Sequence, residues 1–215
     1  MALMAAAAVL AWWFWQNQRE REVLRQMIVR LTAEERVAEV WAERRGQDER
    51  GRPRLRLKIL EYDTSGKALE PVYCEFSAND VIHFEALVIR LDDEVVMEGK
   101  GKSIHLFRRA FALDDSGNTY QSCDLNRPLE VPGGYRISGD RFAEEVQRRY
   151  WERFWMYALD EKSRAADRVK NAQIEAPGSR FLPEKIYRLI LERDGGLRIE
   201  ARDIPEILKG ESIGR

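Results

Sequence analysis

The residue types best suited to hold a metal ion in this chain are two histidines and one glutamate. His83 and His105 are the only histidines, and both fall in segments with strand-like sequences. Glu85 follows His83 by two residues, so a strand places both side chains on one face. Imidazole together with carboxylate suits a divalent metal. We therefore predict a candidate metal site formed by His83, Glu85 and His105. This site requires that strand pairing bring the three side chains together. The alternative is two ordinary histidines of a sheet.

A second group of residues could recognise a partner rather than a metal. Aromatic and arginine side chains are dense in the segment RRYWERFWMY. Trp, Tyr and Arg dominate the energetics of protein interfaces, which makes the segment a candidate docking surface for a partner or a bilayer. The alternative is that its aromatic residues form core against a sheet. The candidate surface consists of Trp151, Trp155, Tyr157, Arg149 and Arg153.

The sequence points to no catalytic residue set and no cofactor. Its serines and cysteines lie in no recognisable nucleophile motif, so a non-enzymatic role is favoured. Cys74 and Cys123 are too few for a disulfide scaffold or a structural zinc site by themselves. They are expected to be two buried thiols, or one disulfide if the protein faces an oxidising compartment.

The N-terminal stretch MALMAAAAVLAWWFWQNQ is the strongest pattern in the sequence. Residues 2–15 are uncharged and end in a Trp and Phe cluster. The stretch is short for a membrane-crossing helix, which needs about 20 apolar residues, but Trp favours the headgroup level. We predict a single-pass transmembrane anchor (a signal-anchor) at residues 1–17 that contacts the lipid bilayer. The expected interface residues are Trp12, Trp13, Trp15, Arg19 and Arg21.

Two other interpretations of this stretch are weaker. A cleaved export signal needs basic residues before the apolar run and a small-x-small site after it, and neither is present. A helix buried in a soluble core remains the other alternative.

Positive residues follow the run, so the charge rule favours a cell-membrane protein whose bulk domain faces the cytoplasm. An outward-facing domain is left open.

The remainder of the chain predicts an α+β protein. Apolar residues spaced by three and four over 19–31 predict a short helical stalk at 18–32. One domain is expected over 33–210. Strict alternation in 54–62, with strand-like runs at 71–76, 81–91 and 103–113, predicts a mostly antiparallel sheet. Asp140 is expected to open a long aromatic-rich helix that packs on this sheet and runs to residue 169.

The last part of the domain and the overall charge complete the prediction. Residues 171–178 are expected to be a loop, and 185–203 a hairpin. The formal net charge is −1 with mixed-sign surfaces, which argues against nucleic-acid binding. The function expected is a membrane-anchored, non-enzymatic binding or scaffold protein with a protein partner. The alternative is a membrane-tethered metal- or ligand-binding domain, or an enzyme, that uses His83, Glu85 and His105.

Overall fold

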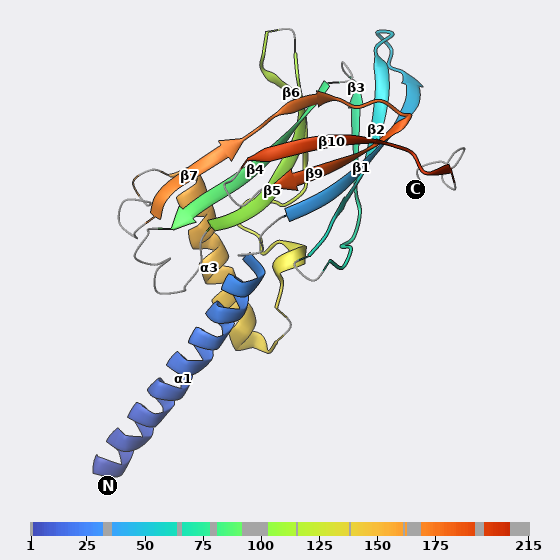
Figure 1. Ribbon diagram of the computed structural model, residues 1–215. Coiled ribbons are helices and arrows are strands. Elements are labelled where there is room, and N and C mark those ends of the chain that lie inside the picture. The colour runs from blue at the N-terminus through green and yellow to red at the C-terminus, as the bar shows by residue number, and fades with distance from the viewer. Residues whose placement is uncertain are drawn as a thin grey trace.

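The protein is described by a computed structural model. The described residues are 2–31, 36–63, 66–77, 81–91, 103–114, 116–137, 139–160, 162, 169–191 and 196–206. Asn79-Asp80 and Asp194-Gly195, whose residue types are typical of tight turns between strands, lie outside them. The fold is α+β, with an N-terminal helix, two antiparallel sheets and one further long helix (Figure 1).

Helix α1 (Ala2–Leu31) runs without a break from the apolar stretch into the expected stalk. Its sequence carries no Gly or Pro and is rich in Ala, Leu and Arg, which favours one continuous helix. Figure 1 shows the N-terminal part of α1 extending away from the rest of the molecule, while its C-terminal part lies against α3. Up to Leu31, the expected helix at 18–32 is confirmed as the second half of α1.

The expected transmembrane span over residues 1–17 does not qualify as one. Within the described part of the chain, no helix is long and apolar enough to cross a membrane. The physical reason is length, because the apolar residues 2–15 rise only about 21 Å as a helix, against a hydrocarbon core of about 30 Å.

Two antiparallel sheets make up the body of the protein. The first has the order β10-β9-β1-β2-β3, and the second has the order β6-β5-β4-β7 with β8 also paired to β4. The strands of the first are β1 (Arg36–Gln47), β2 (Pro53–Glu61), β3 (Val72–Ser77), β9 (Lys185–Leu191) and β10 (Leu197–Asp203). Those of the second are β4 (Val81–Leu91), β5 (Ser103–Leu113), β6 (Thr119–Asp124), β7 (Val169–Glu175) and β8 (Gly178–Arg180).

The two sheets pack face to face around the main hydrophobic core. In β2, Leu55, Leu57 and Ile59 alternate with polar residues and are buried. They belong to the same cluster as Phe84 and Phe107 of the second sheet. Alternation of this kind lets each strand bury one face, so it explains why the sequence forms a two-layer sandwich.

A layer of helices covers the outer face of the second sheet. Helix α3 (Arg141–Leu159) begins at Asp140, whose side chain accepts a hydrogen bond from the Ala143 N–H as an N-cap. A second hydrophobic cluster joins both helices to β4 and β5. Its buried members include Trp151 and Trp155 of α3, Leu87 and Leu106 of the sheet, and Val23 and Met27 of α1.

Three expectations about chain segments are corrected. Helix α3 ends at Leu159 rather than at residue 169, because the charged segment that follows Leu159 has no apolar face to bury. Residues 171–175 of the loop expected at 171–178 belong to β7, since this strand pairs with β4. Strand β6, which carries few apolar residues, was not expected; it pairs with β5 as an edge strand.

The two cysteines form a disulfide between the two sheets. Cys74 of β3 and Cys123 of β6 have Cα atoms 5.8 Å apart, within the range that a disulfide spans. Each lies on the edge strand of its own sheet, so the bond closes one side of the sandwich. Of the two expectations for the cysteines, the disulfide is the one that the structure contains.

Candidate functional site

His83 of the predicted metal site is held by structural contacts on the outer face of the second sheet. Its ring stacks on Phe111 of the neighbouring strand, with ring centres 5.1 Å apart and planes inclined by 17°. Its Nδ1 lies 3.1 Å from the carbonyl oxygen of Ala176. One ring nitrogen and one ring face are therefore already engaged.

Glu85 lies on the same face and is bound by two arginines. A β-bulge in β5 sets Arg108 and Arg109 opposite this single residue of β4. Arg109 Nε donates to Glu85 Oε2 at 2.6 Å, and Arg108 donates to Oε1. The residue is only 3% exposed, so the two arginines supply the charge compensation that a buried carboxylate requires. Both oxygens of Glu85 are thus committed to internal ion pairs.

The strand register sets His105 apart from the other two candidate ligands. His105 pairs with Val88, three residues along β4 from Glu85, whereas His83 pairs with Phe111. The side chain of His105 lies outside the described residues. Among the residues that are described, no group of three or more metal-ligating side chains is close enough to hold an ion. The metal site stays a prediction.

The candidate docking surface on α3 divides into buried and exposed members. Trp151 and Trp155 are 1% and 0% exposed and lie inside the cluster between α3 and the sheet. The indole of Trp155 donates to the carbonyl oxygen of Glu130 at 3.1 Å. Tyr157 is half-buried, while Arg149 and Arg153 are exposed. The alternative that the aromatic residues form core therefore describes both tryptophans.

The residues expected at a membrane surface all lie on α1, and all of them except Arg19 are exposed. Trp12, Trp13 and Trp15 are 61%, 60% and 53% exposed on the projecting part of α1. Arg21 is exposed as well, but Arg19 faces α3 and bonds to Asp140 at 2.7 Å. This hydrogen bond from Arg19, assisted by the Ala143 N–H, lowers the pKa of the Asp140 carboxyl.

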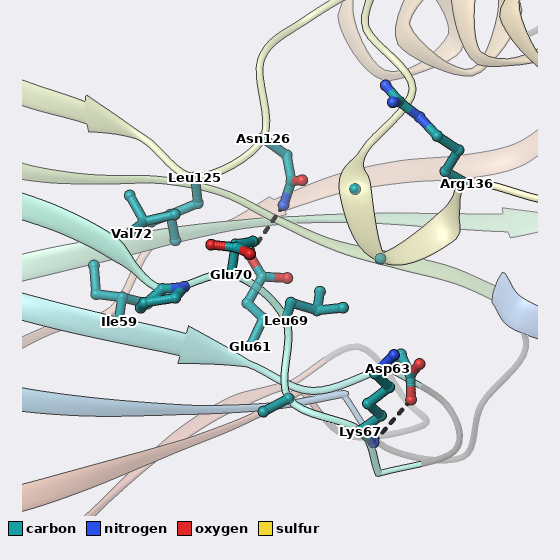
Figure 2. A pocket seen from close by; sticks show the side chains of 14 residues that line it. Ile59, Glu61, Asp63, Lys67, Leu69, Glu70, Val72, Leu125, Asn126 and Arg136 are labelled. Atoms are coloured by element: carbon teal, nitrogen blue, oxygen red, sulfur yellow. Dashed lines mark hydrogen bonds between the residues drawn. The ribbon is translucent and has the colours of Figure 1, made fainter.

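A pocket of about 740 Å³ lies at the end of the sandwich beside the short 3-10 helix η1 (Gly133–Tyr135) (Figure 2). Its walls come from the end of β2, the connection from β2 to β3, the residues after β6, and η1. The lining is mixed: apolar Ile59, Leu69, Pro71, Val72 and Leu125, acidic Glu61, Asp63 and Glu70, basic Lys67 and Arg136, and Asn126.

One carboxylate of this pocket is fixed by a buried side chain. Asn126, which is 8% exposed, donates from Nδ2 to Glu61 Oε1 at 3.1 Å and to the Phe107 carbonyl oxygen at 2.8 Å. The backbone N–H of Leu69 donates to the carbonyl oxygen of Glu61 at 2.9 Å. Glu70, the residue after Leu69, also lines the pocket (Figure 2).

No sequence pattern marks this pocket. Its residues come from four separated segments and form no motif, and the element that closes it, η1, is three residues long. A mixed run such as EYD around Glu61 carries no pattern that distinguishes a pocket wall from a turn.

Comparisons with known proteins add no further assignment. No family model, no curated protein and no solved structure matches this chain.

Proposed function

We propose that this chain is a membrane-held binding protein, in which α1 attaches to a lipid bilayer and the β-sandwich binds a protein partner. One observation carries the proposal: the projecting part of α1 exposes large apolar side chains on every side. They are Met4, Val9, Leu10, Trp12, Trp13, Phe14 and Trp15, each more than half exposed.

Such a surface needs a covering environment. A contiguous exposed apolar surface marks an interaction site or a membrane contact. Here the exposed residues surround the helix and are not confined to one stripe, which suits a fluid apolar medium better than a flat protein surface. Three exposed Trp residues between the apolar segment and the charged residues 19–22 match the preference of Trp for the headgroup level.

The disulfide supports an outward-facing location for the sandwich. Disulfides persist in oxidising compartments and are rare in the reducing cytosol. The Cys74–Cys123 bond thus favours the outward-facing alternative over the cytoplasmic orientation that the charge rule favoured. We infer that the sandwich binds its partner on the oxidising side of the membrane.

Vesicle flotation tests the membrane attachment. The purified full chain is mixed with phosphatidylcholine–phosphatidylglycerol vesicles and centrifuged through a density gradient. We expect the wild-type protein to float with the vesicles and the variant Trp12→Glu/Trp13→Glu/Phe14→Glu to remain at the bottom. The matched control is Met156→Glu/Ile174→Glu, which adds charge at two exposed apolar residues of the body and should still float.

Two outcomes would contradict the proposal. The first is flotation of the triple glutamate variant with the same yield as the wild type. The second is a wild-type protein that stays at the bottom but elutes in gel filtration as an assembly that the triple variant lacks. That result would show α1 to be covered by other copies of the chain instead of lipid.

A further inference from the structure

We propose that the pocket beside η1 receives a single lysine or arginine side chain of a partner polypeptide. This inference deepens the binding role of the proposed function by naming the chemistry of the partner, and it does not depend on the attachment of α1 to a membrane.

The lining suits a long basic side chain from stem to head group. Ile59, Val72 and Leu125 provide apolar wall, and Glu61 and Glu70 lie next to it (Figure 2). Lysine and arginine have the same division, an apolar stem that packs on hydrocarbon and a cationic head that seeks carboxylate oxygens. The pocket therefore complements a basic side chain in both charge and apolar surface.

The acidic end of the pocket is held in place before a ligand arrives. Asn126 is buried and bonds both to Glu61 and to the backbone of β5, so Glu61 is tied to the core of the sandwich. A fixed acceptor lowers the ordering cost of binding.

The size and the other charges of the pocket favour a polypeptide with an isolated basic residue. A volume of about 740 Å³ is far more than one side chain fills, so residues that flank the base would occupy the rest. Lys67 and Arg136 also line the pocket, and Figure 2 shows them on other parts of its wall than Glu61 and Glu70. Their positive charges would repel a second base close to the first, and so select against a polycation.

Saturation-transfer NMR on the full chain in mild detergent tests this inference with small probes. The first probe is Nα-acetyl-lysine methylamide, and the second is its norleucine analogue, which has the same stem without the charge. We expect saturation transfer to the lysine probe and at least tenfold weaker binding of the norleucine probe. The blocked pentapeptide Ala-Ala-Lys-Ala-Ala should bind at least tenfold more tightly than the single lysine.

A charge-removing variant locates the binding. Glu61→Gln/Glu70→Gln retains the side-chain shape and an acceptor for Asn126, and we expect it to weaken pentapeptide binding tenfold or more. Glu49→Gln/Glu184→Gln removes the same charge from exposed positions outside the pocket and should leave binding unchanged. Thermal unfolding of both variants establishes that each is folded.

Several outcomes would overturn the inference. The first is equal binding of the norleucine and lysine probes, and the second is an equal loss of pentapeptide affinity in both double variants. The third is spermidine binding at this pocket as tightly as the pentapeptide, which would make it a polyamine site. Flotation of Glu61→Gln/Glu70→Gln with vesicles separates the two proposals. A variant that floats but does not bind the pentapeptide is the expected result, and failure of flotation in the wild type would count against membrane attachment alone.

Discussion

Arg19 of α1 donates a hydrogen bond to Asp140, the N-cap residue of α3, with 2.7 Å between Arg19 Nη2 and Asp140 Oδ2. The next residue of α1, Glu20, accepts hydrogen bonds from Arg149 and, at 3.0 Å, from the Tyr150 hydroxyl. Val23 then continues the contact into the buried cluster. The two helices are therefore joined by polar contacts at the surface and apolar contacts beneath them.

The Arg19–Asp140 pair predicts a loss of stability in acid. Because Arg19 lowers the pKa of the Asp140 carboxyl, the folded state binds this proton less readily than the unfolded chain. The contribution of this pair to the free energy of unfolding is therefore complete above the ordinary Asp pKa of about 3.9. It is lost as the pH falls through the lowered pKa of Asp140. Urea unfolding between pH 6 and pH 3 should show a shallower decline for Asp140→Asn than for the wild type. A decline of equal steepness in both proteins would contradict the assignment, and Asp124→Asn, an exposed residue of β6, is the control.

The bulge that sets two arginines on Glu85 predicts a large effect of a single substitution. Glu85→Leu leaves Arg108 and Arg109 without their common carboxylate, and breaking one partner of a buried ion pair costs about 3–5 kcal/mol. Glu75→Leu breaks the exposed pair with Arg54 and should cost about 1 kcal/mol or less. Denaturant unfolding of the two variants measures the difference. Equal costs would show that the Glu85 cluster is not structural.

The disulfide predicts a separate loss of stability. The sequence separation of 49 residues gives about 4 kcal/mol in the chain-entropy model, so Cys74→Ala/Cys123→Ala should unfold at a clearly lower denaturant concentration. Dithiothreitol should lower the midpoint of the wild type and leave that of the double variant unchanged. Alkylation of the protein in lysates without reduction should find no free thiol. Complete alkylation of both cysteines would contradict both the bond and the proposed compartment.

Two adjacent residues of α3 distinguish core from docking surface. Trp155 is completely buried, and Trp155→Ala should cost about 3–5 kcal/mol because it leaves a large cavity. Met156 is 49% exposed, and Met156→Ala should change the free energy of unfolding by about 0.5 kcal/mol or less. Thermal or denaturant unfolding measures both. Similar small values for the two variants would return Trp155 to the candidate docking surface.

The strands with strict alternation were predictable from the sequence, and the weakly patterned ones were not. Strand β2 alternates Leu and Ile with Arg and Lys, which allows only one face to be buried. Strand β6 (TYQSCD) has no comparable alternation, because as an edge strand it buries little. The end of α3 was misplaced since the residues after Leu159 are good helix formers without an apolar face.

The functional residues were less predictable than the strands. The spacing of His83 and Glu85 correctly set them on one strand, β4, but alternation alone cannot reveal that a bulge directs both Arg108 and Arg109 toward Glu85. The Glu61–Asn126 contact joins residues 65 positions apart, so only the assembled sandwich creates it. Pairing of Cys74 with Cys123 likewise depends on which strands lie at the two sheet edges.

The continuity of α1 has a mechanical consequence for the proposed function. Met27 follows Trp15 by twelve positions, a rise of about 18 Å along one unbroken helix. No loop intervenes between the exposed aromatic residues and the part of the helix that is buried against α3, so one continuous helix connects the two regions. A tilt of its outer end would turn the whole sandwich with it. The pocket would thereby stand at a set height and angle above the bilayer, and a partner on the same membrane would have to present its basic side chain at that height.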